Sequence, residues 1–291
     1  MTEPALSAAQ RDAFDRDGYT VLPGLIPPDL LARLRTSFDR MLIADDPADK
    51  VILPTGNGAV VVNLDRLCAR DDLSVLELAG LPAILCLAQE LCGDDFFPIQ
   101  EFAVIKHRGD RNPVLWHQDM VHGRSGTCFT LGIYLDDATP GDGALQVVPG
   151  SHRDPRDICA LMQGARRDVP MRAGDGLLHD MMLAHGSEPL SERPIRRVIY
   201  FEFLSAAQVA RERIYSAEVA RSRQRLLHAA TRLRAERNPG ECRFELPFAN
   251  PAQDDAAGTV AEIVAEIYAA PVRARCSSYC VNGTAVFAAI D

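Results

Sequence analysis

The sequence predicts a single-domain α+β protein whose core is a β-sandwich or β-barrel with helices around it. Two observations favour this class. Apolar residues before residue 93 recur mainly at helical spacing, whereas residues 93–204 contain many short β-like runs separated by Gly, Pro and Asp. A helical part followed by many short strands is typical of α+β folds.

The N-terminal part is predicted to be mostly helical. Ser7 to Gln10 fit a capping box that opens a helix, Gly18 can close this helix, and residues 19–22 then form a short strand. A second helix begins at Pro27, and its apolar residues lie at helical spacing. A further helical segment covers residues 74–91, with an interruption in its middle. This part of the chain is therefore expected to support the core with helices.

The strands of the core are predicted after Gly93. They are the runs FFPIQEFAVIK, GTCFTLGIYLDD, GALQVVPG, GDGLLHDMM and RRVIYFEFL, which are bounded by turn-forming residues. Helical spacing returns over residues 206–237. We therefore expect one domain with three parts: mostly helical support in residues 1–92, the core in residues 93–204, and a helical arm with a C-terminal segment in residues 205–291.

Composition and charge exclude some classes of function. The formal net charge of −9 disfavours non-specific nucleic-acid binding, because such binding needs a positive surface. The N-terminus lacks the basic and apolar regions of a signal peptide, and no apolar run is long enough to span a bilayer. The sequence thus predicts a cytoplasmic protein that binds neither nucleic acid nor a membrane.

The cysteines favour the same compartment. None of the eight belongs to a C-x-x-C pair, and most lie in apolar stretches, so reduced and buried thiols are expected. Cys276 and Cys280 are close enough in sequence to pair with each other or to bind a metal. No second Cys or His pair stands nearby, which makes this the less favoured alternative.

The sequence WHQDM, residues 116–120, contains the first candidate for chemistry. On a strand, positions i and i+2 project from the same face, so His117 and Asp119 can reach one ion while Gln118 points away. A histidine from a distant strand would complete a 2-His-1-carboxylate triad, which holds Fe(II) and leaves coordination positions open. His185 is the candidate. Taken alone, His-x-Asp is more often a pair of polar residues at a strand end.

The sequence downstream changes this balance. GALQVVPGSH (residues 143–152) and GDGLLHDMMLAHGSEPLSERPIRR (residues 174–197) follow WHQDM in the order and spacing of one enzyme family. From the helix and Gly-Tyr strand of residues 8–24 to about Leu204, the chain resembles the phytanoyl-CoA dioxygenase family of Fe(II)- and 2-oxoglutarate-dependent oxygenases. The resemblance implies a mainly β core built as a double-stranded β-helix, a jelly-roll or cupin-like fold, with flanking helices.

The resemblance also implies residues of a site. The implied iron ligands are His117, Asp119 and His185. Arg196 would bind the C5 carboxylate of 2-oxoglutarate, with Ser187 as a hydroxyl helper, and a guanidinium is a natural bidentate partner for a carboxylate. Family members add an amide or a lysine upstream of the first histidine. Gln100 is the candidate for this role, and Asn63 is an alternative.

Two neighbouring arginines compete for the carboxylate. The bend at residues 188–194 would return the chain beside His185 as a second strand. On that strand Arg196 shares a face with a tyrosine and a glutamate, whereas Arg197 shares one with isoleucine and phenylalanine. Periodicity alone would bury the face of Arg197. A jelly-roll strand has two covered faces, one of which lines a polar pocket, so we expect Arg196 to be the clamp and Arg197 to be exposed.

The function implied by the resemblance is the oxygenation of a small molecule. The default outcome is hydroxylation of a secondary metabolite, amino acid or acyl-CoA, with Fe(II), 2-oxoglutarate and O2 as cofactor and co-substrates and with release of succinate and CO2. Two alternatives remain open. A cupin-like metalloenzyme that does not use 2-oxoglutarate would leave Arg196 unexplained, and a catalytically silent binding protein could keep the same fold.

The remaining basic residues receive weaker predictions. Residues 206–237 hold eight arginines against three glutamates, which indicates either a solvated helix face or a basic lid that closes over an anionic substrate. Among the other histidines, His152 is expected to belong to a structural turn. Ordinary hydrogen-bonded roles are expected for His122 and His179, although either could line the pocket.

Overall fold

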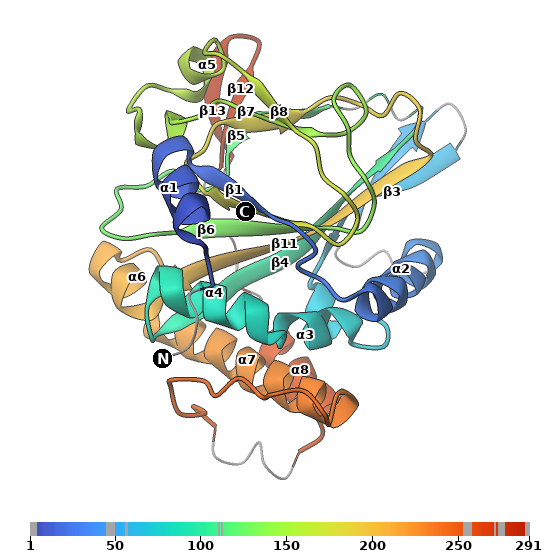
Figure 1. Ribbon diagram of the computed structural model, residues 1–291, viewed down its shortest axis with the longest axis vertical. Coiled ribbons are helices and arrows are strands. Elements are labelled where there is room, and N and C mark those ends of the chain that lie inside the picture. The colour runs from blue at the N-terminus through green and yellow to red at the C-terminus, as the bar shows by residue number, and fades with distance from the viewer. Residues whose placement is uncertain are drawn as a thin grey trace.

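Two antiparallel β-sheets face each other in the computed structural model (Figure 1). The structure describes residues 5–44, 50–55, 58–109, 111, 113–252, 258–270, 272 and 277–288. In order across the larger sheet lie β1 (Tyr19–Leu22), β9 (Gly176–Asp180), β6 (Phe129–Tyr134), β11 (Ile195–Ser205), β4 (Phe96–His107), β3 (Gly58–Asp65) and β2 (Lys50–Thr55). In order across the smaller sheet lie β13 (Thr284–Ala288), β12 (Ser277–Val281), β5 (Val114–Gln118), β10 (His185–Ser187), β7 (Leu145–Val147) and β8 (Arg167–Val169). This architecture confirms the predicted jelly-roll core with flanking helices.

Most helices pack on the outer face of the larger sheet, away from the smaller one, whereas the short helix Ile158–Leu161 packs against the smaller sheet (Figure 1). The helices are α1 (Ala8–Asp17), α2 (Pro28–Ile43), α3 (Ser74–Ala79), α4 (Pro82–Cys92), α5 (Ile158–Leu161), α6 (Ala206–Glu212), α7 (Ala217–Arg237) and α8 (Val260–Ala269). Short 3-10 turns cover Leu67–Ala69 and Ser151–Arg153. Apolar residues of α2, α3, α4, α7 and α8 form one core with the outer face of β4, β6 and β11. A second core fills the space between the sheets.

The local signals at the N-terminus act as predicted. The side chain of Ser7 accepts a hydrogen bond from the backbone of Gln10, and the side-chain oxygen of Gln10 accepts one from the backbone N–H of Ser7, which completes the capping box. Gly18 ends α1 with φ of 83°, a left-handed conformation that suits glycine. The interruption predicted within residues 74–91 separates α3 from α4.

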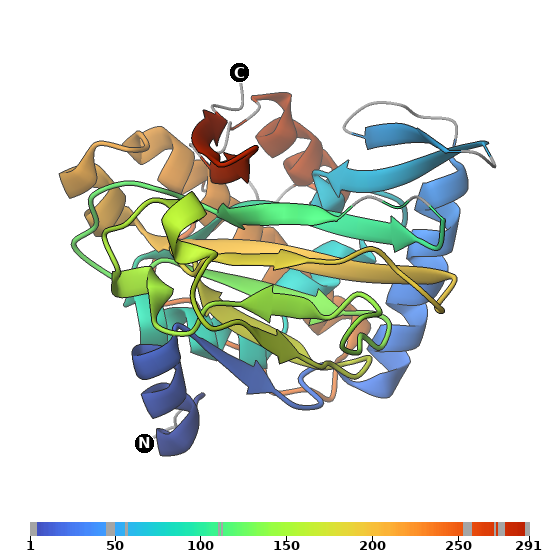
Figure 2. The same cartoon turned by 90° about the horizontal axis from the view of Figure 1, so that it is seen from above.

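Two hairpins outside residues 93–204 extend the sheets. The hairpin β2–β3 joins the larger sheet through β4, and the hairpin β12–β13 joins the smaller sheet through β5. Figure 2 shows both hairpins along the same side of the molecule. The first lies within the part expected to be mostly helical. Its β-branched residues on both sides of Gly-Asn-Gly are a hairpin signal that the helical spacing around them obscured.

The segment predicted as one helix over residues 206–237 is two helices. It breaks at Arg213, which has a positive φ of 57°, and α7 then starts at the cap residue Ser216. The long helix α7 packs across β4 and against α3 and α8. No helix in the described ranges combines the length and the apolar character needed to cross a membrane.

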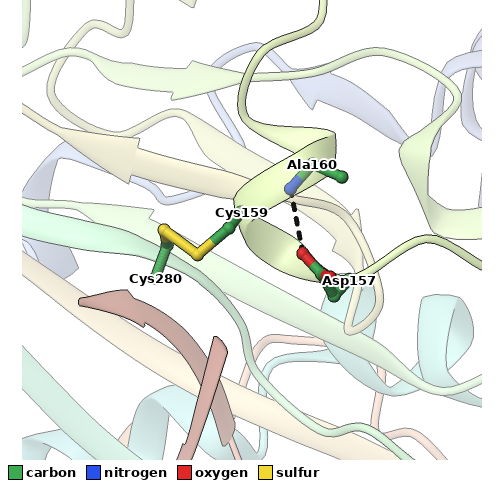
Figure 3. Close-up of a disulfide and its surroundings, with 4 residues drawn as sticks. All are labelled: Asp157, Cys159, Ala160 and Cys280. Atoms are coloured by element: carbon green, nitrogen blue, oxygen red, sulfur yellow. Dashed lines mark hydrogen bonds between the residues drawn. A yellow bond between two sulfur atoms is a disulfide. The ribbon is translucent and has the colours of Figure 1, made fainter. Parts of the chain in front are cut away.

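The expectation of reduced cysteines is wrong for one pair. Cys159 of α5 and Cys280 of β12 form a disulfide, with their Cα atoms 5.0 Å apart (Figure 3). They are 121 residues apart in sequence, so only the packing of α5 against β12 brings them together. Cys276, the partner considered for Cys280, lies outside the described residues. Cys68, Cys92 and Cys128 are buried free thiols, as predicted, whereas Cys242 is exposed.

Candidate metal centre

The structure brings His117, Asp119 and His185 together. His117 is near the end of β5, Asp119 follows that strand, and His185 opens β10, where it pairs directly with His117 in the sheet register. The Nε2 atoms of the two histidines lie 3.3 and 3.5 Å from Oδ1 of Asp119. One potential ligand atom from each residue falls within 4.8 Å of the others. The predicted triad is therefore a compact cluster built on two adjacent strands.

Hydrogen bonds orient these side chains. Nδ1 of His117 donates to the carbonyl oxygen of Leu115 over 2.7 Å, and Nδ1 of His185 donates to that of Leu183 over 2.9 Å. These bonds place the ring protons on Nδ1 and leave each Nε2 with a lone pair that faces Asp119. Thr130 donates its hydroxyl to Oδ2 of Asp119 over 2.7 Å, which leaves Oδ1 toward the histidines.

The electrostatics of the cluster suit a divalent cation. Burial lowers the pKa of His185 to about 3, with a further contribution from the nearby His117, so the imidazole is neutral at physiological pH. Burial opposes charge on Asp119, but the surrounding histidines outweigh it and hold the pKa of that carboxyl below its ordinary value. Two imidazoles and one carboxylate with open space beside them form the donor set of non-haem iron sites.

A cavity of about 490 Å³ opens beside the cluster. Its wall includes His117 and Asp119 together with residues of both hairpins. From the C-terminal hairpin, Tyr279 stacks on the ring of His117 at a centroid distance of 5.1 Å, and Ser277 donates to the carbonyl oxygen of Asp119 over 2.8 Å. The C-terminal hairpin, for which the sequence predicts no function, thus contacts two of the three candidate metal ligands, His117 and Asp119, directly.

Arg196 lies in the interior between the sheets, with 1% of its surface exposed. Its Nε and Nη1 atoms have no hydrogen-bond partner among the described residues, and the same is true of the buried hydroxyls of Ser187 and Tyr134. The guanidinium carbon lies 6.0 Å from the centre of the Tyr134 ring. A fully buried cation with unsatisfied donors is costly unless an anion binds it. The sequence does not single out Tyr134.

The strand of Arg196 is placed differently from the prediction. The bend after Ser187 does not return the chain beside His185, because β10 belongs to the smaller sheet and β11 to the larger one. Arg196 instead pairs in register with Lys106 of β4. Lys106 is buried and reaches across to β10, where its Nζ donates to the carbonyl oxygens of Ser187, over 3.0 Å, and of Glu188.

Lys106 is a residue that the sequence analysis did not select. The signal for it is a lysine on a predicted strand, an even number of positions from Gln100 and so on the same face. Gln100 and Asn63 both line the cavity, so their position agrees with either amide candidate. The Gln100 amide donates to Glu202 over 2.7 Å.

Arg197 is not exposed, contrary to the prediction. It retains 7% of its surface and lies on the opposite face of β11 from Arg196. Its guanidinium pairs with Asp136 over 2.9 Å and with Asp39 of α2 over 2.7 Å. The face of β11 that carries Arg197 is thus buried, as periodicity alone predicted. The carboxylates of Asp136 and Asp39 neutralise the charge of the guanidinium.

The basic lid, one of the two alternatives for residues 206–237, is also wrong. Figure 1 shows α7 on the outer face of the larger sheet, with the sheet between it and the smaller sheet. Five of the eight arginines form ion pairs, Arg232 with Glu236 of the same helix and the other four with carboxylates of other segments: Arg223, Arg225, Arg234 and Arg237. They stabilise helix packing and do not line the cavity in the described part of the chain.

Three other histidines have separate positions. His152 packs against Gly18, where an added Cβ would lie 2.5 Å from the imidazole Nδ1, in agreement with a structural turn. His122 bonds to Glu212 over 2.9 Å, as expected for a hydrogen-bonded residue. His179 is buried with its ring 4.7 Å from that of His185, and it borders the metal cluster.

Comparison with known proteins decides the family. The sequence model of phytanoyl-CoA dioxygenase matches residues 14–198, which is well over half of the chain. The chain belongs to the phytanoyl-CoA dioxygenase family. The matched segment contains the three clustered residues and Arg196, and it ends within β11. The family predicted from the sequence motifs is thus confirmed.

Several curated proteins and solved structures are similar to the chain. L-proline trans-4-hydroxylase of Streptomyces griseoviridis is 31% identical over 52% of this chain and 56% of its own length. Ectoine dioxygenase of Nocardia farcinica is 29% identical over 61% of this chain and 71% of its own. The solved structure of AviO1 from Streptomyces viridochromogenes is 29% identical, with a TM-score of 0.60 over 71% of this chain and 98% of that one. The chain spans only about half the length of most of the curated relatives that it matches, which include further ectoine dioxygenases.

Proposed function

We propose that the protein is an Fe(II)- and 2-oxoglutarate-dependent dioxygenase that hydroxylates a small-molecule metabolite and releases succinate and CO2. The observation that carries this proposal is a buried pair of complementary sites in one core. A 2-His-1-carboxylate cluster suits Fe(II), and a buried arginine with unsatisfied donors suits a dicarboxylate. Relatives that hydroxylate L-proline and ectoine support an amino acid or related metabolite as the substrate class.

Each side chain then has a role that follows from its position. His117, Asp119 and His185 would hold the iron, and the bonds to Leu115 and Leu183 keep both imidazoles in the tautomer that ligates through Nε2. Iron bound there supplies the redox chemistry that couples O2 to the decarboxylation of 2-oxoglutarate. The three side chains would hold the metal from one side, which would leave positions for small-molecule ligands.

The 2-oxoglutarate end of the site would be built on four strands, β4, β6, β10 and β11. Arg196 of β11 binds the distal carboxylate, and the buried hydroxyls of Ser187 and Tyr134 donate to it. Lys106 adds a positive charge beside Ser187 and so favours an anion at this end. Gln100, from the cavity wall, could contribute its amide oxygen or nitrogen near the metal. These donors exist before the ligand binds, which reduces the cost of ordering them.

The test is spectroscopic and catalytic. Anaerobic addition of Fe(II) and 2-oxoglutarate should produce the weak visible charge-transfer band of a chelated 2-oxo acid. With O2 and a panel of amino acids and cyclic amino-acid derivatives, one substrate should raise succinate formation above the uncoupled background. His185→Ala should abolish the band and the succinate, whereas His122→Ala, outside the cluster, should keep both.

Two outcomes would contradict the proposal. A metal-loaded wild-type protein without the band would favour a cupin-like metalloenzyme that does not use 2-oxoglutarate. Equal bands from wild type and His185→Ala would show that the triad is wrongly assigned.

A further inference from the structure

One buried charged group on the cavity wall has no part in the site described above. Glu202 lies on β11, on the same face as Arg196 and Tyr200, and retains 3% of its surface. It borders the cavity of about 490 Å³ together with His117 and Asp119. The side chain is therefore buried within the protein and faces the space beside the metal cluster.

Glu202 differs from the other buried acids in its partners. Its one recorded hydrogen bond in the described ranges comes from the Gln100 amide over 2.7 Å, and no described Lys, Arg or His forms an ion pair with it. Each of the other buried acids among the described residues pairs with an arginine: Glu77, Glu101, Asp142 and Asp180. Burial raises the pKa of Glu202 well above its ordinary value, and the nearby Asp119 adds to this effect.

A lone buried carboxylate is costly, because an ion moved from water into a protein loses its solvation, and the group keeps its proton unless a counter-charge replaces that solvation. The scaffold supplies that counter-charge to every other buried acid in the described ranges, but not to this one. A cation that enters the cavity from solvent would satisfy Glu202.

The positions of Arg196, Tyr200 and Glu202 along β11 indicate on which side of the His117–Asp119–His185 cluster such a cation would bind. Arg196 and Glu202 are six residues apart in sequence, which is about 20 Å on an extended strand. Tyr200 lies between them and borders the metal cluster. A dicarboxylate held by Arg196 would thus occupy one side of the cluster, and the acidic wall at Glu202 lies on the other.

We propose that Glu202 determines substrate specificity by binding a positively charged nitrogen of the substrate. The substrate class is a small ammonium or amidinium compound, in place of the anionic substrate considered from the arginine-rich helix. Gln100 is a positioning residue that holds the Glu202 carboxylate toward the cavity. This inference rests on the proposed function, because it assigns the remaining side of the same metal site to the substrate.

The experiment uses a matched pair of probes of nearly equal shape, piperidinium and tetrahydropyran, which differ in charge. The full-length protein is loaded with Mn(II) and 2-oxoglutarate, and the binding of each probe is measured from the relaxation of its protons by the metal. Piperidinium should bind at least roughly tenfold more tightly than tetrahydropyran, since a desolvated ion pair is involved. Glu202→Gln, which keeps the shape and removes the charge, should abolish this preference.

Asp65→Asn serves as the control. Asp65 borders the same cavity but is exposed, so its charge is screened by solvent and the preference should change by less than about threefold. Calorimetric titration of Mn(II) and 2-oxoglutarate is done first on each protein. If both bind and wild type shows no preference for piperidinium, or Glu202→Gln keeps it, the inference is overturned while the proposed function stands. If neither ligand binds to wild type, the proposed function fails and the inference fails with it.

Discussion

Among the described residues, buried charged side chains form ion pairs on the outer face of the larger sheet, whereas two of them on the inner face do not. On the outer face, Glu101 pairs with Arg223 of α7 over 3.6 Å, and Arg197 pairs with Asp136 and Asp39. On the inner face, neither Arg196 nor Glu202 forms an ion pair with another described residue. A charge that the scaffold neutralises contributes to stability. A buried charge without a partner marks a place where a ligand completes the structure.

Strand β11 carries both kinds of charge on alternate residues. Arg196 and Arg197 are adjacent in sequence and both are buried, with 1% and 7% of their surface exposed. Burial alone does not separate the functional arginine from the structural one. The partners do, because only Arg197 has carboxylates within reach.

The largest expected effect is on stability, at the outer face. Arg223→Met leaves Glu101 buried without its counter-charge, and breaking a buried pair in this way typically costs about 3–5 kcal/mol. Urea denaturation should show this loss in the free energy of unfolding. The surviving folded protein should bind 2-oxoglutarate normally, since α7 does not line the cavity. A stable Arg223→Met protein would show that outer-face charges are dispensable and would break the comparison.

The second effect separates the two arginines by ligand affinity. Removing one partner of a buried charge pair costs about 2–5 kcal/mol, so Arg196→Ala should weaken 2-oxoglutarate binding about thirtyfold to several thousandfold. Arg197→Ala should change it by less than about fivefold, because that guanidinium is on the far face, although the protein should unfold more easily. Calorimetric titration with Mn(II) in place of iron measures both. The reverse ranking would make Arg197 the carboxylate clamp.

The third effect has the opposite sign from the first. Burial raises the pKa of Glu202, so the folded protein holds this proton to higher pH than the unfolded chain does. The free energy of unfolding therefore falls as pH rises above 4.5, the ordinary pKa of a glutamate. The Glu202→Gln protein should not show this decrease. In metal-free protein we expect the variant to be more stable at pH 7.5, by about 1 kcal/mol or more, with the gain disappearing near pH 4.5. A destabilised variant would place Glu202 with the structural charges.

The smallest effect concerns the hairpin that closes the inner side. The β12–β13 hairpin pairs with β5 at Ser278 and Tyr279, and Cys280 ties it to α5. In Cys280→Ser the hairpin can detach without unfolding of the sheets. Its amides should exchange at least roughly tenfold faster than in the wild type. Hydrogen-exchange mass spectrometry of residues 277–288 measures this, with Cys242→Ser as the control at an exposed thiol. Unchanged exchange would mean that strand pairing alone holds the hairpin.

Local features of the fold could be predicted because they depend on neighbours in sequence. The capping box at Ser7, the left-handed Gly18 and the strand alternation of β11 are set by side chains within a few residues of one another. The spacing of His117 and Asp119 belongs to the same class. The family motifs then led to His185 and Arg196, two residues whose chemistry is meaningful only in combination.

Tertiary structure alone decided where each charge finds a partner. Arg197 and Asp39 are separated by 158 residues, and Cys159 and Cys280 by 121, so no local pattern records these contacts. The arginine-rich segment illustrates the limit, since its composition is the same whether it lies over the cavity or behind the sheet. Its place behind the sheet was set by the packing of α7 on β4, and this packing also leaves Glu202 facing the cavity without a cation. The reason is physical: electrostatic energy depends on distance and burial in the folded chain, and sequence separation determines neither.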